Sequence, residues 1–450
     1  MNDAQYPHKS PLYPSRPIVV VGGGVAGLEI ATELGRLHRR EPLLHPPVKL
    51  IDRDFAHVWK PMLHTIAAGT RDVHQQQTPF IAQASAAGFS FEPGELCGLN
   101  RKSRAIFLAP YKAPDGRVLV PARRVTYTAL IIAVGSQAND FGTPGVAEHC
   151  HTIDSRSQAE AFSAEIRIRI LQCLAEEELE GITQDLSIAI VGGGATGVEL
   201  AAELIGLADA AEAYGGHGLR SCIHITLIDS GTRLLSAFPQ NISDAVQKRL
   251  ENLGVRVLKN VRVAAATTHG FTLGDGREVS ASLRVWAAGV KAPEFLGTLD
   301  GLQTTRTNQL VVRPNLQTTL DPNVYAVGDC ANLQYEGEER PLPPTAQVAH
   351  QQAQHLIRHL PEFFRRDVPV PDFRHRDFGS LVSLSEYDAY GSLGKTGLLK
   401  GTTFKGWLAQ FSHVLLYRSH QARLHGFWRG GMLWLVDLVN ARLRSKIRLD

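Results

Sequence analysis

Two short glycine-rich segments of this chain have the residue types and spacing that bind a dinucleotide phosphate. Residues 17–37 read PIVVVGGGVAGLEIATELGRL, and residues 187–207 read SIAIVGGGATGVELAAELIGL. At an offset of 170 residues, 11 of these 21 positions are identical. Each copy places G-x-G-x-x-G between a β-branched run and a helical pattern. This context favours a nucleotide-binding βαβ unit over a chance match.

Each glycine of the motif has its own physical task. The first permits a tight turn, the second lets the backbone approach a pyrophosphate, and the third lets the helix pack closely on the strand. The following helix N-terminus can hold phosphate charge with its free N–H groups and its dipole. These glycines are Gly22, Gly24 and Gly27 in the first copy and Gly192, Gly194 and Gly197 in the second.

An acidic residue is expected at the end of the strand that follows each motif, where it can bind a ribose diol. VKLID ends at Asp52, and IHITLID ends at Asp229. Because a carboxylate repels a 2′-phosphate, the second site is predicted to prefer NADH to NADPH. The alternative interpretation is that each aspartate only caps its strand.

Two dinucleotide sites in one chain suggest FAD at the first motif and a nicotinamide nucleotide at the second. Other apolar runs end in the same way, two of them at Gly135 and Gly289 and a third at Gly328-Asp329. An aspartate after a buried strand can accept a hydrogen bond from a flavin ribityl hydroxyl. An ordinary turn aspartate would give the same local pattern.

The elements that must position these residues alternate as strand and helix. They predict an α/β fold with two Rossmann-like, doubly wound dinucleotide-binding domains, one for FAD and one for NADH, plus a C-terminal membrane-associated segment. We expect a discontinuous FAD-binding domain at 1–145 and 291–370. An NADH-binding domain at 146–290 is inserted in it, and a C-terminal domain occupies 371–450.

Composition narrows the function classes. The 450 residues are 44% hydrophobic and 20% charged, which is typical of a folded protein with a large core. The formal net charge of +3 gives no indication of nucleic-acid binding. No apolar stretch is long enough to span a membrane, and the polar, proline-rich residues 1–17 lack the apolar core of a secretory signal, so we expect a disordered lead-in. The eighteen histidines show no metal-binding spacing, so no metal site is predicted and the histidines are expected on the surface.

Four segments carry a resemblance to a known family. GGGATGVELAAEL, WAAGVKAPEFL, VYAVGDCA and above all PPTAQVAHQQA (343–353) resemble the type II NADH dehydrogenases, which are single-subunit NADH:quinone oxidoreductases among the two-dinucleotide-binding flavoproteins. The resemblance runs from about Pro17 to the C-terminus. It implies non-covalent FAD on the first motif, NADH on the second, and two-electron transfer to ubiquinone or menaquinone without proton pumping.

The resemblance also implies roles for individual residues. Pro343 and Pro344 precede a predicted helix from about Thr345, whose N-terminus could face the N1–C2=O edge of the flavin. Gln347 and Gln351 share a face of that helix. The family places these amides at the quinone headgroup, whereas without the family a solvated polar face would be the simpler interpretation.

Glu199, two residues after the third glycine of the second motif, matches a family glutamate linked to NADH handling or proton transfer. The alternative is a first-turn glutamate favoured by the helix dipole, as expected for Glu29, its counterpart in the first copy. Lys60 and Pro61, in a segment (52–69) similar to the family's loop over the flavin, are expected near the isoalloxazine, although the family often has glutamine in place of Lys60.

The complete predicted sites are as follows. The residues expected to bind FAD are Gly22, Gly24, Ala26, Gly27, Asp52, Lys60, Pro61, Gly135, Gly328, Asp329, Ala346 and Gln347. The residues expected to bind NADH are Gly192, Gly194, Thr196, Gly197, Glu199, Asp229 and Gly289. The residues expected to act in catalysis are Glu199, Gln347 and Gln351.

From Lys405 to the end, apolar residues alternate with cations. This segment holds eight Lys/Arg and two Asp, among them Arg418, Arg423 and Arg429 between tryptophans, leucines and phenylalanines. Such a pattern indicates amphipathic helices in a membrane interface, and cations there gain about 1 kcal/mol each against anionic lipid. We therefore expect a peripheral protein on an anionic membrane surface, at the cytoplasmic face of a bacterial inner membrane. A dimer interface, giving a homodimer, or a core helix pair is the alternative.

Two other functions compete with NADH:quinone oxidoreduction. A sulfide:quinone reductase needs redox cysteines near the flavin, and Cys150 and Cys330 could in principle be recruited. The complete second motif argues against that assignment. The five cysteines form no C-x-x-C or C-x-x-x-x-C, which argues against a disulfide reductase. The other competitor is a redox-sensing NAD(H)/FAD-binding protein whose output is partner binding.

Overall fold

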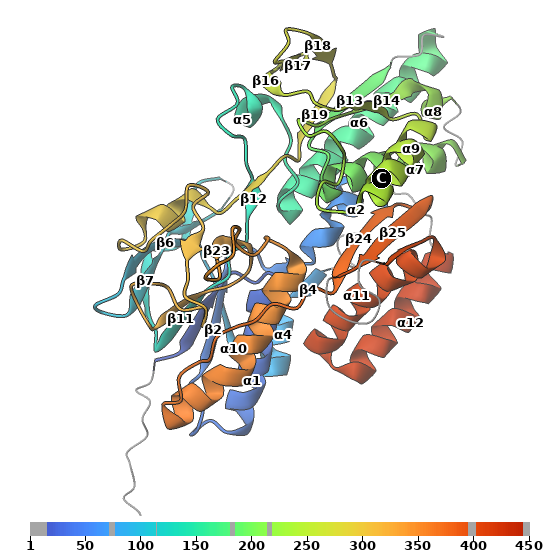
Figure 1. Ribbon diagram of the computed structural model, residues 1–450. Helices are drawn as coiled ribbons and strands as arrows, with labels where there is room; N and C mark the ends of the chain where they lie inside the picture. The colour runs from blue at the N-terminus through green and yellow to red at the C-terminus, as the bar shows by residue number, and fades with distance from the viewer. Residues whose placement is uncertain are drawn as a thin grey trace, which may run out of the picture. The chain divides into compact units, whose positions relative to one another are not determined.

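The computed structural model describes residues 16–71, 77–113, 115–180, 185–213, 218–394 and 402–443 (Figure 1). Most of the expected N-terminal lead-in lies outside these residues. The chain divides into two compact units. The first unit comprises Met1–His57, Gln77–Gln137 and Lys291–His375, and the second comprises Val58–Gln76, Ala138–Val290 and Arg376–Asp450.

The first unit is built on a five-stranded parallel sheet in the order β22-β11-β1-β2-β5. Its strands are β1 (Ile18–Val21), β2 (Val48–Asp52), β5 (Ser90–Pro93), β11 (Ala129–Ile132) and β22 (Val324–Ala326). The central strand β1 is buried along its whole length, as its β-branched run predicts. It ends at Gly22, whose φ is +101° and where a Cβ would lie 2.4 Å from the Ala133 carbonyl oxygen. Only glycine fits this turn.

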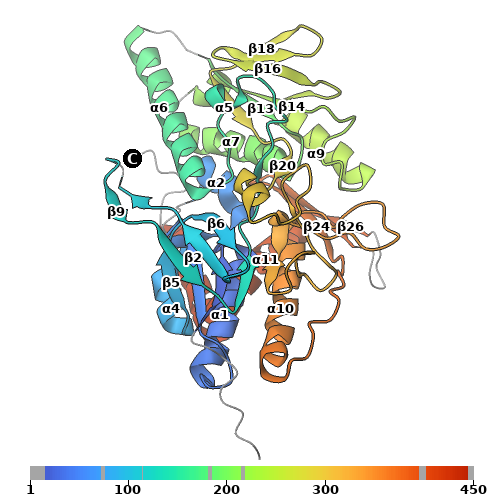
Figure 2. The same ribbon diagram turned by 90° about the vertical axis from the view of Figure 1, so that its left-hand side faces the viewer.

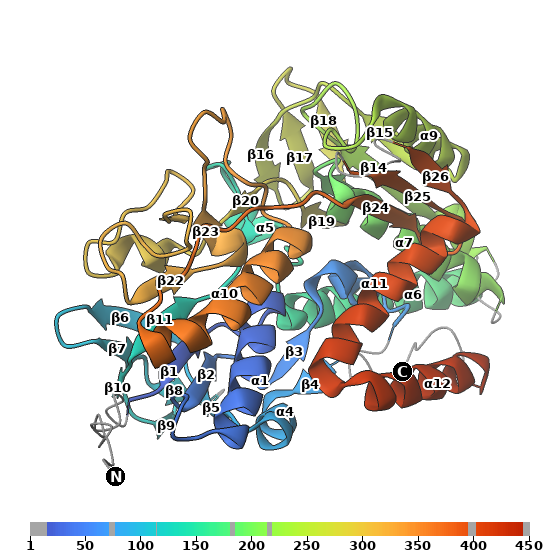
Figure 3. The same cartoon turned by 60° about the horizontal axis from the view of Figure 1, so that its bottom comes forward.

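Three helices of the first unit are α1 (Val25–Arg40), α4 (Phe80–Ala87) and α10 (Ala346–Arg366), and α1 packs against both others (Figure 3). Residue 27 must be glycine because a Cβ there would lie 1.8 Å from the Gly22 carbonyl oxygen. A second, antiparallel sheet has the order β10-β7-β6. Its strands are β6 (Leu96–Asn100), β7 (Ala105–Leu108) and β10 (Arg123–Thr126).

The second unit repeats this architecture with a parallel sheet in the order β15-β14-β13-β19. Its strands are β13 (Leu186–Val191), β14 (Ile223–Ile228), β15 (Arg256–Leu258) and β19 (Leu283–Trp286). Its helices include α2 (Leu63–Ala67), α6 (Arg156–Glu180), α7 (Ala195–Ala213), α8 (Leu219–Cys222) and α9 (Gln240–Asn252). A small antiparallel sheet adjoins it, formed by β16 (Val263–Thr267), β17 (Gly270–Leu273) and β18 (Glu278–Ser280) (Figure 2).

The C-terminal elements belong to the second unit. They are β24 (Gly379–Leu384), β25 (Asp388–Leu393), β26 (Thr403–Lys405), α11 (Trp407–His425) and α12 (Phe427–Leu443). Val382, Leu384 and Tyr390 of this sheet join the same apolar core as α2 and α7. The compact units therefore group 58–76 and 376–450 with the second nucleotide-binding sheet. Because compact packing and functional division need not coincide, our three-domain division stays a prediction.

The remaining short elements complete the described chain. They are β3 (Ala56–Val58), β4 (Gln77–Pro79), β8 (Tyr111–Lys112), β9 (Val118–Val120), β12 (Gln137–Ala138), β20 (Val290–Lys291), β21 (Leu310–Val311), β23 (Ala331–Asn332), α5 (Val146–His149), and the 3₁₀ turns η1 (Lys60–Met62), η2 (Glu294–Thr298) and η3 (Gly328–Cys330). Among the described residues, none of the helices combines the length and the apolar character needed to cross a bilayer.

Candidate active site

The first glycine loop holds an acidic side chain at the end of the next strand. The Gly23 amide donates to Asp52 Oδ2 at 2.5 Å, and the Asp54 amide donates to Oδ1 at 2.8 Å. Burial raises the pKa of Asp52, while these two amide bonds oppose the shift. His57 Nδ1 lies 2.8 Å from the Gly23 carbonyl oxygen. The structure therefore brings Asp52 to the first motif.

The second glycine loop has the same geometry. The Gly193 amide donates to Asp229 Oδ2 at 2.5 Å, and the Gly231 amide donates to Oδ1 at 2.6 Å. A Cβ at Gly194 would meet no atom within 4 Å, and at Gly24 of the first loop the nearest atom would be 4.0 Å away. Both middle glycines thus border open space at a helix N-terminus, which fits a bound pyrophosphate.

A further part of the first unit gathers around Asp329. Ser136 Oγ donates to Asp329 Oδ2 at 2.7 Å, and Gly135 beside it has a φ of +72° with open space where a Cβ would be. The Gly328 amide donates to Gln352 Oε1 at 2.7 Å. The predicted residues Gly135, Gly328 and Asp329 therefore lie together. Gln352, fully buried on α10, is a positioning residue that sequence reasoning missed.

Helix α10 begins where the sequence predicts. Thr345 is its N-cap, and the Thr345 Oγ1 accepts from the Val348 amide at 3.2 Å. Gln351 Nε2 donates to Gln347 Oε1 at 3.5 Å, and both side chains are half-buried. The two predicted glutamines share one helix face, directly after the half-exposed Ala346.

Glu29 does more than favour a helix dipole. Its side chain is 1% exposed, and Oε2 lies 2.6 Å from His350 Nδ1 and accepts from Gln354 Nε2 at 3.2 Å. These contacts fasten α1, which follows the first glycine loop, to α10, which carries the paired glutamines. A lone first-turn glutamate is therefore the wrong interpretation of this position.

Lys60 and Pro61 belong to the second unit. Lys60 Nζ lies 3.9 Å from Asp154 Oδ1. The neighbouring Trp59 is buried against α11, with its ring centroid 5.2 Å from that of Tyr417 and 6.3 Å from that of His420. This segment is therefore fixed to the C-terminal helices by aromatic packing.

Glu199 is buried in the first turns of α7. Its Oε1 accepts from the Ser383 amide at 3.0 Å, and its Oε2 lies 3.5 Å from His64 Nδ1. Burial raises the pKa of Glu199 to about 8, and Glu203 adds to the shift, so the carboxyl group is protonated at neutral pH. Burial lowers the pKa of His64 to about 3, so the imidazole is neutral. The sequence predicts no role for Glu203, which is also buried on α7.

The expectation that the histidines lie on the surface is wrong for several of them. His57, His64 and His420 are buried. His57 binds the first glycine loop, His64 contacts Glu199, and His420 stacks on Trp59. Each is placed by contacts between segments far apart in the chain, which a search for metal-binding spacings cannot detect.

The other predicted nucleotide residues fall on the loops. Ala26 is buried in the first turn of α1, and Thr196 is exposed in the first turn of α7. Gly289 has a φ of +64°, and a Cβ there would lie 2.4 Å from the Phe141 ring. Glycine at this position thus lets an aromatic side chain cover the loop after β19.

All five cysteines lie in the described residues and are free thiols. Burial raises the pKa of Cys150 and of Cys330 to about 12. Cys330 Sγ also lies 3.3 Å from the Val327 carbonyl oxygen. Both groups are therefore neutral thiols at physiological pH, and a neutral thiol is a poor nucleophile.

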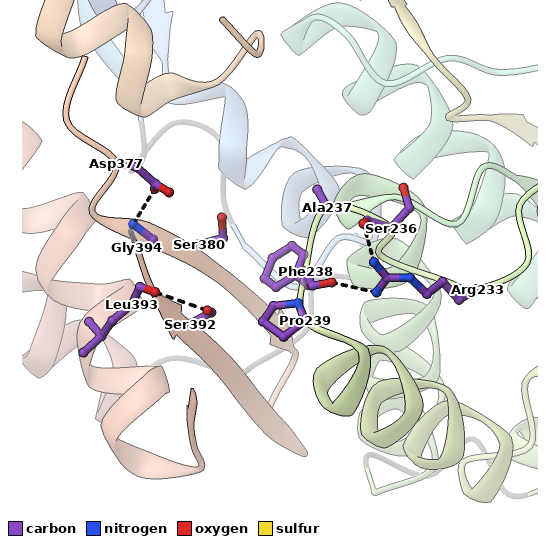
Figure 4. Close-up of a pocket in the computed structure, with 11 residues that line it drawn as sticks. Arg233, Ser236, Ala237, Phe238, Pro239, Asp377, Ser380, Ser392, Leu393 and Gly394 are labelled. Atoms are coloured by element: carbon purple, nitrogen blue, oxygen red, sulfur yellow. Dashed lines mark hydrogen bonds between the residues drawn. The ribbon is translucent and has the colours of Figure 1, made fainter. Parts of the chain in front are cut away.

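A cavity of about 640 Å³ lies in the second unit between the loop after Asp229 and the C-terminal sheet (Figure 4). Arg233 in this loop donates to the carbonyl oxygens of Phe238 at 2.6 Å and Ser236 at 2.7 Å. The Arg233 guanidinium thus donates to carbonyl oxygens of its own loop, whereas Asp229 accepts from the glycine motif.

Two parallel sheets, each with a glycine turn, an open helix N-terminus and a strand-end carboxylate, define a protein that binds two dinucleotides. The profile of the pyridine nucleotide-disulphide oxidoreductase family matches residues 16–353. A Type II NADH:quinone oxidoreductase of Haemophilus influenzae is 41% identical over 96% of this chain and 99% of its own length. One from Staphylococcus aureus is 25% identical over 84% and 89%.

This chain belongs to the pyridine nucleotide-disulphide oxidoreductase family and, within it, to the type II NADH:quinone oxidoreductases. The solved structure of NDH2 from Plasmodium falciparum in complex with NADH has the same fold, with a TM-score of 0.79 at 20% identity. It covers 97% of this chain and 100% of its own.

Proposed function

We propose that this protein is an FAD-dependent NADH:quinone oxidoreductase that passes two electrons from NADH to a membrane quinone, ubiquinone or menaquinone, and pumps no protons. The observation that carries this proposal is the 41% identity to a Type II NADH:quinone oxidoreductase over almost the whole of both chains. The two loops with their strand-end carboxylates support it, because each has the geometry that a dinucleotide needs.

The first unit is proposed to hold FAD without a covalent bond. When bound, FAD would supply the redox chemistry between the nicotinamide and the quinone. The open backbone at Gly24 fits the pyrophosphate, and Asp52 is set at the strand end for a ribose diol. Asp329, oriented by Ser136, is assigned the ribityl chain, and the N-terminus of α10 is assigned the flavin edge.

The second unit is proposed to bind NADH. Asp229 would accept hydrogen bonds from the ribose diol of the nucleotide, while Gly194 lets the pyrophosphate approach. The negative charge of the Asp229 carboxylate disfavours a 2′-phosphate on the ribose. We therefore assign NADH, rather than NADPH, as the electron donor.

Gln347 and Gln351 are assigned the quinone headgroup. Gln351 Nε2 donates to Gln347 Oε1. A side-chain amide N–H of this pair can donate to a quinone carbonyl oxygen, and an amide C=O can accept from a hydroquinone hydroxyl. Oxidation of NADH by a quinone consumes one proton from solvent. We assign to Glu199 the role of supplying that proton. As a neutral acid at pH 7, Glu199 holds that proton on its carboxyl group.

We also propose that α11 and α12 attach the protein to an anionic membrane surface, at the cytoplasmic face. Large apolar side chains on these helices are exposed, with Phe427 at 80%, Trp428 at 83% and Trp407 at 71%. The apolar side chains are spread around both helices rather than confined to one face, so the expectation of amphipathic helices is wrong. An exposed apolar area of this kind is still typical of a membrane-binding or protein-binding surface. A homodimer interface is the competing use of the same face.

The quinone assignment can be tested by separating the two half-reactions. Replacing Gln351 with Ala should slow reoxidation of the reduced enzyme by a short-chain quinone by about fivefold or more, because a hydrogen bond of about 1 kcal/mol is lost. Reduction by NADH in a stopped-flow spectrometer should stay near the wild-type rate. Arg358→Ala, at an exposed position two turns further along α10, is the matched control. An equal fall in both half-reactions would show that Gln351 is structural.

A further inference from the structure

A second carboxylic acid lies one helical turn beyond Glu199. Glu199 and Glu203 are four residues apart on α7, so their side chains share a helix face with Cβ atoms about 5–6 Å apart. Both side chains are buried, and Glu203 raises the pKa of Glu199 through its charge. Burial and a nearby like charge both disfavour the charged form, so two carboxyl groups buried side by side do not readily ionise together.

Glu203 has hydroxyl partners that lead outward. Thr70 Oγ1 donates to Glu203 Oε2 at 2.7 Å, and a side-chain hydrogen bond joins Glu203 to Ser385. Thr70 and Ser385 are half-buried, and the residues that follow them, Arg71 and Glu386, are exposed. Glu203 is as buried as Glu199, each being 7% exposed, and it contacts two half-buried hydroxyl groups that precede exposed residues.

Two backbone features accommodate the hydrogen bond between Ser385 and Glu203. Ser385 has a φ of +55°, a conformation that is uncommon for a residue other than glycine. Its Oγ would lie 2.9 Å from a Cβ at Gly206, so a side chain there would displace it. Glycine inside a helix costs about 1 kcal/mol relative to alanine. The left-handed backbone at Ser385 and the glycine at position 206 thus both keep the Ser385 hydroxyl beside Glu203.

The charges that face the pair come from every packed element. His64 lies on α2, and Arg71 follows that helix. Glu386 and Tyr387 lie in the turn between β24 and β25. His413 lies on α11, and its charge lowers the pKa of His64. His64 is neutral because burial lowers its pKa to about 3, so it cannot supply a proton near pH 7. Burial also raises the pKa of Glu203. The two glutamates are thus the groups on this path that can take up and release protons.

We propose that Glu203 is a proton relay that passes protons from the half-buried Thr70 and Ser385 hydroxyls to Glu199. The proposal rests on the proposed function, in which Glu199 gives up one proton per turnover. When Glu199 loses its O–H proton, Glu203 releases its own to the Glu199 carboxylate and takes another from solvent through a hydroxyl group. Each step breaks one O–H bond and forms one, and no electrons move.

The test uses Glu203→Gln in the full-length holoenzyme, because glutamine keeps the shape and the hydrogen bonds but cannot carry a proton. In the resting protein at about pH 6, the infrared carbonyl band of the protonated Glu199 is identified by its loss in Glu199→Gln. After transfer to D₂O, this band should shift at least about tenfold more slowly in Glu203→Gln than in the wild type. Glu212→Gln, further along α7, should exchange at the wild-type rate.

In turnover, Glu203→Gln should reduce quinone at least about tenfold more slowly at pH 7, with a larger solvent isotope effect. NADH binding and flavin reduction should be unchanged. An unchanged exchange rate together with an unchanged isotope effect would overturn the relay. If Glu199→Gln itself leaves quinone reduction unaffected, then the proposed function of Glu199 fails instead, and the two failures are distinguishable.

Discussion

At the scale of single residues, backbone amides and burial decide what each acid does. The carboxylates of Asp52 and Asp229 each accept two backbone N–H groups. Glu199 and Glu203 lie on a helix face enclosed by the C-terminal sheet and the α2 segment, where the charged form is disfavoured. The fold thus orients two strand-end acids through backbone amides and buries two other acids, whose pKa values burial raises.

The buried acid makes stability depend on pH. The folded-state pKa of Glu199, about 8, exceeds the ordinary value of 4.5, so its contribution is fully present below about pH 4.5 and is lost as pH rises through about 8. Each unit of pKa shift is worth about 1.4 kcal/mol. The free energy of unfolding from urea titrations should therefore fall over this window, and Glu199→Gln should flatten that fall.

Glu251→Gln, on the exposed face of α9, is the control and should leave the pH profile of stability unchanged. If Glu199→Gln and the wild type lose stability in parallel between pH 5 and pH 8, then Glu199 is ionised in the folded protein. The proton role assigned to it would then lack its physical basis.

At the scale of elements, two helices are joined by a buried polar cluster. Glu29 on α1 contacts His350 and Gln354 on α10, so the helix after the first glycine loop fixes the helix that carries Gln347 and Gln351. Glu29→Ala should lower the free energy of unfolding by about 1–3 kcal/mol, because two partners lose a buried acceptor. It should also raise the KM for quinone, since α10 is less firmly held.

Glu33→Ala is the matched control, one turn further along α1. Glu33 forms a partly exposed ion pair with Arg36, and such pairs contribute about 0–1 kcal/mol. Equal losses of thermal stability in the two variants would contradict a special role for the Glu29 cluster.

Packing between the C-terminal helices pairs one of the cations expected to face lipid. Helices α11 and α12 follow one another at the end of the described chain (Figure 3). Arg418, expected among the lipid-facing cations, donates to Asp437 Oδ2 at 2.6 Å and so joins α11 to α12, while Arg429 is exposed. The prediction that Arg418 faces lipid is therefore wrong, because its side chain is only 13% exposed and is paired with Asp437. Of the other cations in this prediction, Arg444, Lys446 and Arg448 lie outside the described residues. Many of the large apolar side chains, among them Trp407, Phe427 and Trp428, are by contrast exposed, whereas Tyr417 and Leu424 are buried.

Replacing Phe427 and Trp428 with Ser should weaken binding to vesicles of anionic lipid by about tenfold or more, since each large apolar side chain contributes about 1.5–3 kcal/mol on burial. Sedimentation with vesicles measures this, and high salt should weaken wild-type binding only in part. Replacing the exposed Ile81 and Phe107 of the first unit with Ser is the control. Vesicle binding that survives the tail substitutions would favour a dimer interface instead.

At the scale of the whole molecule, the sequence predicts what local patterns determine and misses what distant contacts determine. The two glycine turns, the acids Asp52 and Asp229 and the start of α10 follow from short motifs, because each depends on neighbouring residues. Glu203 and Gln352 could not be found in this way. Thr70 and Glu203 are 133 residues apart, and Gln352 acts through the amide of Gly328, so both roles exist only in the folded chain.

The most direct test of the account is the visible spectrum of the purified protein under anaerobic conditions, mixed first with NADH and then with a short-chain quinone. We predict flavin absorption that bleaches with NADH, bleaches much more slowly with NADPH, and recovers fully when the quinone is added. Absence of flavin, bleaching by NADPH at least as fast as by NADH, or bleached flavin that quinone does not reoxidise would contradict it.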